Sequence, residues 1–380
     1  MSSRKILFLL IKNEIIGLSF SLKTEINFKT LYGLSKKHDL AHLVFDAAIK
    51  NDLIDKESEL YQKASKVKLL AIYRYSQQNA EYKRIKDCFQ NNAIQFVPLK
   101  GSIIRDYYPE SWMRTSCDID VLIHEEDLKK ATEALLAIGF TTDGVRHYHD
   151  ISFLKGSVHL ELHFNICEMN KQLDILLEQA WDYVEQYDRY EYRETSSYFM
   201  FHHIAHMAYH FLTGGCGIRP VLDLWILKRK HQYNEEQLIE LLNKCHLVSF
   251  YNSACHLSEV WFGEEEHNEA TLQMEKHIIE GGAYGTSEKG AVTGVARHGG
   301  SKFKYKLSIA FPSYKDMCKM YPVLINHKIL LPFCYIGRIF SKLFGRKGKQ
   351  VMNRSKTINN ASKEEAKKFA YLIKELELDY

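Results

Sequence analysis

Residues 117–123 (CDIDVLI) constrain the fold of this chain most, because polar and apolar residues alternate strictly along them. An alternation of period two is typical of a β-strand with one face in the core. It places Asp118 and Asp120 on one face and Ile119 and Val121 on the other. Two neighbouring carboxylates repel each other unless a cation lies between them, which makes this strand a candidate metal site. Two solvated aspartates on an exposed edge are the alternative, and the D-x-D pattern alone does not decide between them.

The segments around this strand alternate between strand and helix patterns. In chain order they are a β-rich run (94–99), an amphipathic helix closed by Gly139 (125–138), and two strand candidates joined by Lys155-Gly156-Ser157 (147–154 and 158–166). The last two predict a hairpin. This order predicts a compact α/β domain over residues 91–195.

The rest of the chain has the pattern of a helical protein. Proline is scarce, at 6 of 380 residues, and apolar periodicity favours helices over residues 1–90 and 196–280. Residues 281–300 contain seven glycines without regular periodicity, which predicts a mobile loop that acts as a lid or linker. Residues 301–380 form a basic helical tail. The predicted fold class is therefore α+β, with a mixed β-sheet core flanked by N-terminal and C-terminal helical regions.

Bulk properties give few clues to partners. The net charge of +4 is small, so charge alone does not predict a broad nucleic-acid-binding surface. The eight cysteines are scattered without a C-x-x-C pair, which is typical of reduced thiols in a cytosolic protein. The apolar run 6–11 is too short for a signal peptide or a membrane span. We expect a cytoplasmic protein. The sequence does not indicate an oligomeric state.

Two further motifs suggest a phosphate and metal site. Lys100-Gly101-Ser102 lies where a strand turns into a helix, and amides at such a turn can bind phosphate oxygens. An ordinary helix cap is the alternative. In 159–163 (HLELH), His159, Glu161 and His163 share one face of a predicted strand. If that strand lies beside 117–123, a third carboxylate completes a metal cradle.

Together these residues resemble the nucleotidyltransferase superfamily that shares the fold of DNA polymerase β. LKGSIIRDYYPESWMRTSCDIDVLI followed by HLELHF resembles its uncharacterised bacterial nucleotidyltransferase branch, over about residues 96–166. HHIAHMAYHFLTGGCGIRPVLDLWIL (202–227) is similar to the helical segment of that branch. The resemblance implies a nucleotidyltransferase-type sheet and triphosphate binding by Gly101 and Ser102. It also implies catalytic two-metal coordination by Asp118, Asp120 and Glu161.

The implied chemistry is transfer of a nucleoside monophosphate from an NTP to an acceptor, with release of pyrophosphate. Mg²⁺ (or Mn²⁺) suits these oxygen ligands. Lys100 and Arg114 would neutralise phosphate charge, with surface salt bridges as the alternative. The acceptor is expected to be a small molecule or a protein, because no basic-aromatic strip accompanies the motifs to bind nucleic acid. A non-catalytic nucleotide-sensing or partner-binding module is the main alternative, and a metal-dependent phosphohydrolase is a weaker one.

Several other residues are candidates for the cleft. His202, His206 and His210 are four residues apart and share one helix face with His203 beside them. A cleft-lining role, a zinc site and core packing remain open for this face. His163, His203, His206 and Arg219 are the predicted cleft-lining residues, and Arg219 is expected to pair with Asp223.

The segment Leu330 to Phe344 is both apolar and basic. It predicts either contact with an anionic membrane surface or packing within the helical tail, and packing is the more frequent role of such a segment.

Overall fold

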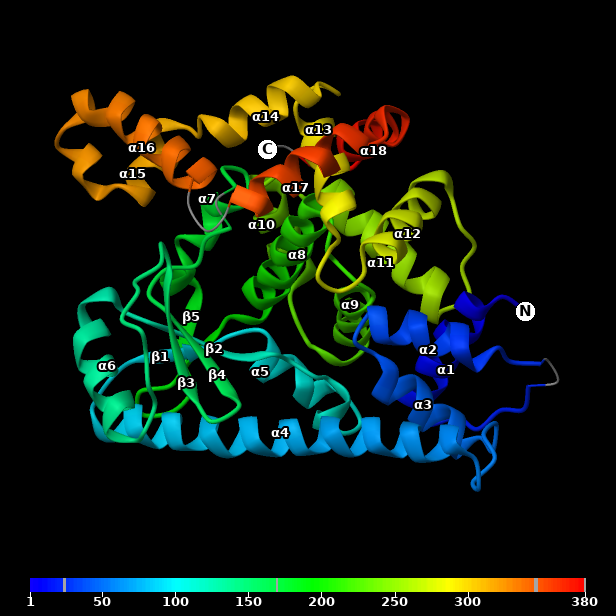
Figure 1. Cartoon of the computed structure of the whole chain (residues 1–380). Helices are drawn as coiled ribbons and strands as arrows, with labels where there is room; N and C mark the ends of the chain where they lie inside the picture. The colour runs from blue at the N-terminus through cyan, green and yellow to red at the C-terminus, as the bar shows by residue number, and fades with distance from the viewer. Residues whose placement is uncertain (23–24, 169, 345–347, 379–380) are drawn as a thin grey trace.

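The computed structural model describes residues 1–22, 25–168, 170–344 and 348–378. The fold is mixed α+β, as the sequence predicts, with a small sheet surrounded by helices (Figure 1). The N-terminal region contains α1 (Ser3–Ile16), α2 (Phe28–Lys37), α3 (Ala41–Lys50) and α4 (Glu59–Asn91). The single periodic stretch 35–50 is divided between α2 and α3, because Asp39 adopts a positive φ of 54° that no helix continues through.

The sheet has the strand order β1-β2-β4-β3. Its strands are β1 (Phe96–Pro98), β2 (Asp118–Ile123), β3 (Asp150–Lys155) and β4 (Val158–His163). β2 and β4 are parallel, whereas β1 pairs with β2 and β3 pairs with β4 in the antiparallel sense. The sheet is therefore mixed, and the predicted hairpin is the β3–β4 pair. The C-terminal end of α4 and α6 (Leu128–Ala137) cover its apolar face, where Phe89, Leu135 and Leu160 are fully buried.

Helices after the sheet complete the main apolar core. In chain order, the elements that follow the sheet are α7 (Asp174–Leu177), the short strands β5 (Val184–Gln186) and β6 (Tyr192–Glu194), α8 (Ser196–Thr213), α9 (Arg219–Lys230), α10 (Glu235–Lys244), α11 (Val248–Phe262) and α12 (Glu269–Gly281). One core cluster joins side chains of α1 and α3 to those of α8, α9 and α11. The N-terminal helices are therefore packed with the helices that follow the sheet.

The glycine-rich stretch 281–300 is not the mobile loop that its composition predicts. Most of it is helix α13 (Ser287–Arg297). Before this helix, residues 281–285 pack backbone to backbone against 214–217: a Cβ on Gly215 would lie 2.6 Å from the amide nitrogen of Gly285. Within α13, a Cβ on Gly294 would lie 2.1 Å from the Tyr305 ring. These glycines provide close approach, which composition alone does not distinguish from flexibility.

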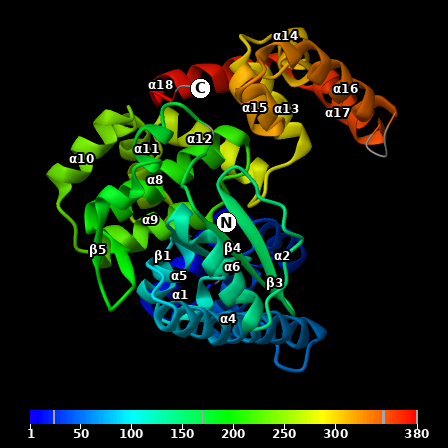
Figure 2. The same ribbon diagram turned by 90° about the vertical axis from the view of Figure 1, so that its left-hand side faces the viewer.

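The basic tail consists of five further helices. They are α14 (Lys302–Ala310), α15 (Tyr314–Met320), α16 (Leu331–Phe344), α17 (Gly348–Asn360) and α18 (Lys363–Glu375). The predicted final helix corresponds to α18, which packs into the main core. Helices α14–α17 project from the molecule on the side opposite α4, as the two perpendicular views show (Figure 1, Figure 2). Among the described helices, none is long and apolar enough to span a membrane.

The close contact between Gly215 and the backbone of Gly285 predicts the effect of adding one methyl group at residue 215. Gly215→Ala should lower the free energy of unfolding by about 1–3 kcal/mol, because the new Cβ meets the backbone of Tyr284 and Gly285. Gly33→Ala is the matched control: Gly33 lies in α2 with open space around it, so it should stabilise by about 0.5–1 kcal/mol. Urea unfolding measures both. Equal effects of the two substitutions would show that the contact is not constraining.

Burial of His277 predicts a pH dependence of stability. Burial lowers the pKa of His277 to about 4 from 6.5, against the raising effect of its hydrogen bond to the Phe211 carbonyl. The stabilisation is complete above pH 6.5 and is lost as the pH falls towards 4, because the unfolded chain takes up the proton first. Between pH 6.5 and 4, the free energy of unfolding of His277→Gln should fall less steeply with decreasing pH than that of wild type. The difference between the two slopes should be about 1.4 kcal/mol per pH unit. Identical slopes from urea titrations would contradict this.

Candidate active site

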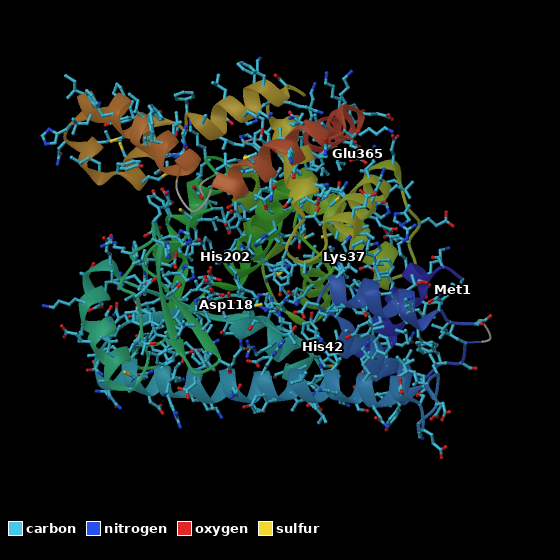
Figure 3. All side chains as sticks on the ribbon, viewed as in Figure 1. Met1, Lys37, His42, Asp118, His202 and Glu365 are labelled. Carbon is cyan, nitrogen blue, oxygen red and sulfur yellow. The ribbon has the colours of Figure 1, made fainter. Side chains whose placement is uncertain are left out.

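The parallel register of β2 and β4 brings the acidic residues together. Asp118 lies opposite His159, and Asp120 lies opposite Glu161. The ligand atoms of Asp118, His159 and Glu161 lie within 4.8 Å of one another. The same holds for Asp120, Glu161 and His163, so Glu161 belongs to both groups. Figure 3 shows Asp118 in the interior of the molecule, between the sheet and the helices.

The electrostatics of these carboxylates favour a bound cation. Burial would raise the pKa of Asp120, but the hydrogen bond and charge of His163, with further help from Lys100, bring it below its ordinary value. Burial and the neighbouring Asp120 raise the pKa of Asp118. Burial, Asp120 and Asp118 raise the pKa of Glu161 to about 7. A negative charge on Glu161 is thus costly unless a cation compensates it.

The donor set fits Mg²⁺ or Mn²⁺. Each of the two groups offers two carboxylates and one imidazole, with Glu161 shared between them. Carboxylate oxygens are the hard ligands that these ions prefer. His163 donates a hydrogen bond to Asp120, with 3.1 Å between Nε2 and Oδ1. This contact fixes the orientation of Asp120 within the group that it forms with Glu161 and His163. The carboxylates predicted to bind metal are therefore gathered at one place by the fold.

A cavity of 420 Å³ lies against these carboxylates. It is lined by β2 and β4, by the turn after β1, and by α8 and α9. Most of the predicted site residues line it: Lys100, Gly101, Arg114, Asp118, Asp120, Glu161, His163, His203, His206 and Arg219. Ser102 is the exception, since it lies in the four-residue helix α5 (Gly101–Ile104), outside the lining, with its N–H bonded to the Leu99 carbonyl. The fold thus brings together residues from distant parts of the chain.

Lys100 occupies a strained position at the rim of this cavity. Its backbone has φ 32° and ψ −95°, a conformation that non-glycine residues rarely adopt. Leu99 just before it donates its N–H to the carbonyl of Asp120 at 3.0 Å. The Lys100 amine lies 3.1 Å from Nδ1 of His206. The strained turn therefore directs the lysine across the cavity toward α8.

Arg114 forms a buried ion pair that the sequence did not reveal. Its Nη2 lies 3.0 Å from Asp223, whose other carboxylate oxygen accepts a hydrogen bond from Tyr108 at 2.6 Å. A Cβ on Gly101 would lie 2.6 Å from Arg114 Nη1, so a larger residue there would require this guanidinium to shift. The predicted Arg219–Asp223 pair is wrong, because Arg219 pairs with Asp39 instead. The turn before α9 directs the Arg219 side chain toward the start of α3.

The histidines of α8 contact different groups, and only His206 and His210 contact each other among the described residues. His206 Nδ1 lies 2.6 Å from Glu168, and His210 Nε2 lies 3.0 Å from His206 Nε2. His202 is buried against Glu194, outside the cavity lining. Among the described residues, no group with metal-ligand spacing includes these histidines. Burial, Lys100 and His210 lower the pKa of His206 well below its ordinary value, so it contributes a neutral imidazole to the cavity.

The cavity lining also includes polar residues that the sequence did not mark as site residues, among them His149, Glu168 and Tyr284. Glu168 follows β4 and meets His206 only because α8 crosses that edge of the sheet. Tyr284 belongs to the glycine-rich stretch, and its hydroxyl lies 3.1 Å from Cys117 Sγ. No local pattern marks these residues, since their neighbours in space are far away in sequence.

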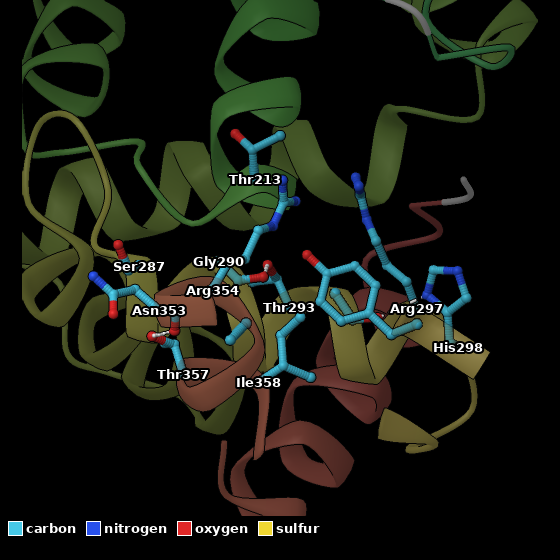
Figure 4. A pocket seen from close by; sticks show the side chains of 13 residues that line it. Thr213, Ser287, Gly290, Thr293, Arg297, His298, Asn353, Arg354, Thr357 and Ile358 are labelled. Carbon is cyan, nitrogen blue, oxygen red and sulfur yellow. Dashed lines mark hydrogen bonds between the residues drawn. The ribbon is translucent and has the colours of Figure 1, made fainter. Parts of the chain in front are cut away.

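A second cavity lies between α13 and α17 (Figure 4). Its volume is 610 Å³, and it is lined by hydroxyl, amide and arginine side chains without a carboxylate. Thr293 and Thr357 already donate to carbonyls of their own helices. This cavity therefore offers no carboxylate to a divalent cation.

The comparison with protein families identifies the group to which this site belongs. A family described as uncharacterised nucleotidyltransferase matches residues 24–263, which include the sheet, α8 and α9. The chain belongs to this nucleotidyltransferase family. Searches of curated proteins and of solved structures each found no match. Membership confirms the resemblance that the motifs around Gly101, Asp118, Asp120 and Glu161 indicated.

The buried ion pair beside the site can be tested directly. Asp223→Ala should lower the free energy of unfolding by about 3–5 kcal/mol, because it leaves the Arg114 guanidinium buried without its anion. Glu259→Ala is the control: it removes the partner of Arg229, whose side chain is 42% exposed, and should cost about 1 kcal/mol or less. Denaturant unfolding measures both. A small loss for Asp223→Ala would show that Arg114 does not depend on this pair.

Proposed function

We propose that this nucleotidyltransferase moves a nucleoside monophosphate from an NTP to an acceptor and releases pyrophosphate. The observation that carries the proposal is the β2–β4 register, which sets Asp120 beside Glu161 at the wall of a cavity. Family membership supports the reaction class. The raised pKa values of Asp118 and Glu161 support the need for a cation.

In this proposal Asp118, Asp120 and Glu161 hold Mg²⁺ or Mn²⁺. The bound ions supply the positive charge that activates the acceptor oxygen and stabilises the departing pyrophosphate. Lys100 provides a positive charge from the opposite wall, toward which a triphosphate would extend. Arg114 acts as a positioning residue, because its guanidinium is bound to Asp223 while its edge packs against Gly101.

A small molecule or a protein side chain suits the acceptor better than a nucleic acid. Among the three cations that line the cavity, Arg114 and Arg219 are already paired with Asp223 and Asp39. A long anionic strand needs a series of available cations along its path, and the lining does not offer one. His206 lines the same cavity, with its ring nitrogens held by Glu168 and His210.

The test uses the full chain, Mg²⁺ or Mn²⁺, each α-labelled NTP and a cell extract as the source of acceptor. Pyrophosphate release and a labelled product are expected. Asp120→Asn and Glu161→Gln should each lower the rate by about a hundredfold or more, because each removes one charge from the cation site. Glu126→Gln, an exposed carboxylate of the same domain, is the control and should leave the rate unchanged.

Each contrary outcome has a distinct meaning. Undiminished transfer by Asp120→Asn would refute the cation site. Release of inorganic phosphate in place of pyrophosphate would indicate a phosphohydrolase. Tight NTP binding without turnover, despite extract and metal, would indicate a non-catalytic nucleotide-sensing module.

A further inference from the structure

Positive charge is concentrated in helices α14–α17, which we call the basic arm (residues 302–360). The arm contains thirteen lysines and arginines and one acidic residue, Asp316, although the whole chain has a net charge of only +4. The remainder of the chain is therefore net acidic. The arm projects from α13 on the side opposite α4 (Figure 1, Figure 2). Such segregation marks a surface for an anionic partner.

The arm also exposes large apolar side chains. Ile329 is 83% exposed and Phe333 is 70% exposed, and Ile336 continues the same series. Spacings of four and three residues place them on one face of the helical segment that leads into α16. On α14, Phe303 and Leu307 are likewise exposed one turn apart. Exposed apolar side chains gathered on a charged surface indicate a binding surface.

Arg338 provides a second, independent observation inside the arm. It is only 8% exposed, and its Nε has no hydrogen-bond partner, while Nη1 donates to the Ala310 carbonyl at 2.9 Å. In the described part of the chain, no carboxylate lies within ion-pair distance of it. A buried guanidinium without a carboxylate is costly unless an anion approaches it. Arg338 is therefore poised to take an anionic group.

Arg338 lines an apolar cavity of 240 Å³ between α14, α16 and α17. Aliphatic side chains such as Ile309, Ile339 and Val351 line it, together with Lys306 and Arg354. An apolar interior with cationic groups at its wall matches a molecule that has a hydrocarbon chain and an anionic head. Phospholipids with net negative charge have both parts.

We propose that the basic arm binds the surface of a bilayer that contains anionic phospholipids. Lysines and arginines would contact the headgroups, while Ile329, Phe333 and Phe303 insert among the upper acyl chains. A nucleic acid would satisfy the charge and could stack on Phe303 and Phe333, but it would leave the aliphatic Ile329 and Ile336 exposed to water. The proposal goes beyond nucleotidyl transfer and does not depend on it.

The experiment is vesicle flotation with the full chain. Vesicles of phosphatidylcholine mixed with phosphatidylglycerol should carry the protein upward, whereas vesicles of phosphatidylcholine alone should not. Added NaCl should weaken the binding, because it screens the attraction between lysines and headgroups. No flotation with the mixed vesicles at low salt would overturn the proposal, and so would equal flotation with both kinds.

Matched variants separate the two contributions. Ile329→Asn combined with Phe333→Asn should weaken partitioning by about tenfold or more, since both side chains would otherwise enter the bilayer and neither substitution changes the charge. Leu69→Asn is the control, because Leu69 is 64% exposed on α4, on the opposite side of the molecule. It should leave partitioning unchanged. Lys304→Ala should weaken it about fivefold through lost charge.

Circular dichroism and urea unfolding confirm that each variant is folded. Equal partitioning by the Ile329/Phe333 double variant and by wild type would overturn the proposal. A competing single-stranded oligonucleotide provides the last comparison. If the arm binds it as tightly as it binds the mixed vesicles, and the double variant binds it unchanged, the arm is a nucleic-acid site and the membrane proposal is wrong.

Discussion

The repulsion among Asp118, Asp120 and Glu161 is the constraint on which the site depends. Parallel pairing of β2 and β4 fixes Asp120 directly beside Glu161. A shift of one residue would turn Glu161 toward α4 and α6. The buried Ile119 and Leu160 prevent that shift, because they must stay on the covered face. The apolar core thus holds the like charges together, and a cation bound there would relieve the resulting electrostatic cost.

A second set of contacts holds the helical region against the sheet. The Arg114–Asp223 pair connects the segment before β2 to α9, and Gly101 leaves the space that this guanidinium fills. Close glycine contacts between 214–217 and 281–285 place Tyr284 at the same cavity. The Arg114–Asp223 pair is buried, and the backbone of 284–285 leaves no room for a side chain at Gly215. The site is therefore built between the sheet and the helices that pack against it.

The basic arm has a different physical character from the body that carries the site. In the body, the buried Asp223 has an ion-pair partner in Arg114. The arm leaves Ile329 and Phe333 exposed and buries Arg338 without a carboxylate. In water the exposed side chains lack an apolar environment and Arg338 lacks an anion. In the proposed complex, an anionic lipid surface supplies both. An arm of this kind would hold a nucleotidyltransferase near acceptors at a membrane.

The sequence by itself determined the features that depend on local patterns. Alternation over 117–123 predicted β2 and the shared face of Asp118 and Asp120, and the spacing of 159–163 predicted the face of Glu161. Motifs around Gly101 indicated the family, which the match over residues 24–263 confirms. Residue types and strand periodicity suffice for these predictions because they concern neighbours in the chain.

Only the tertiary structure decided which distant residues meet. It paired Asp223 with Arg114 where sequence spacing suggested Arg219, and it brought Glu168 to His206. It also showed that the glycines of 281–300 serve close packing and a helix, although their composition predicted a loop. Which residues distant in sequence come into contact depends on how the sheet and the helices pack on one another. A short motif is compatible with several contact partners until that packing is known.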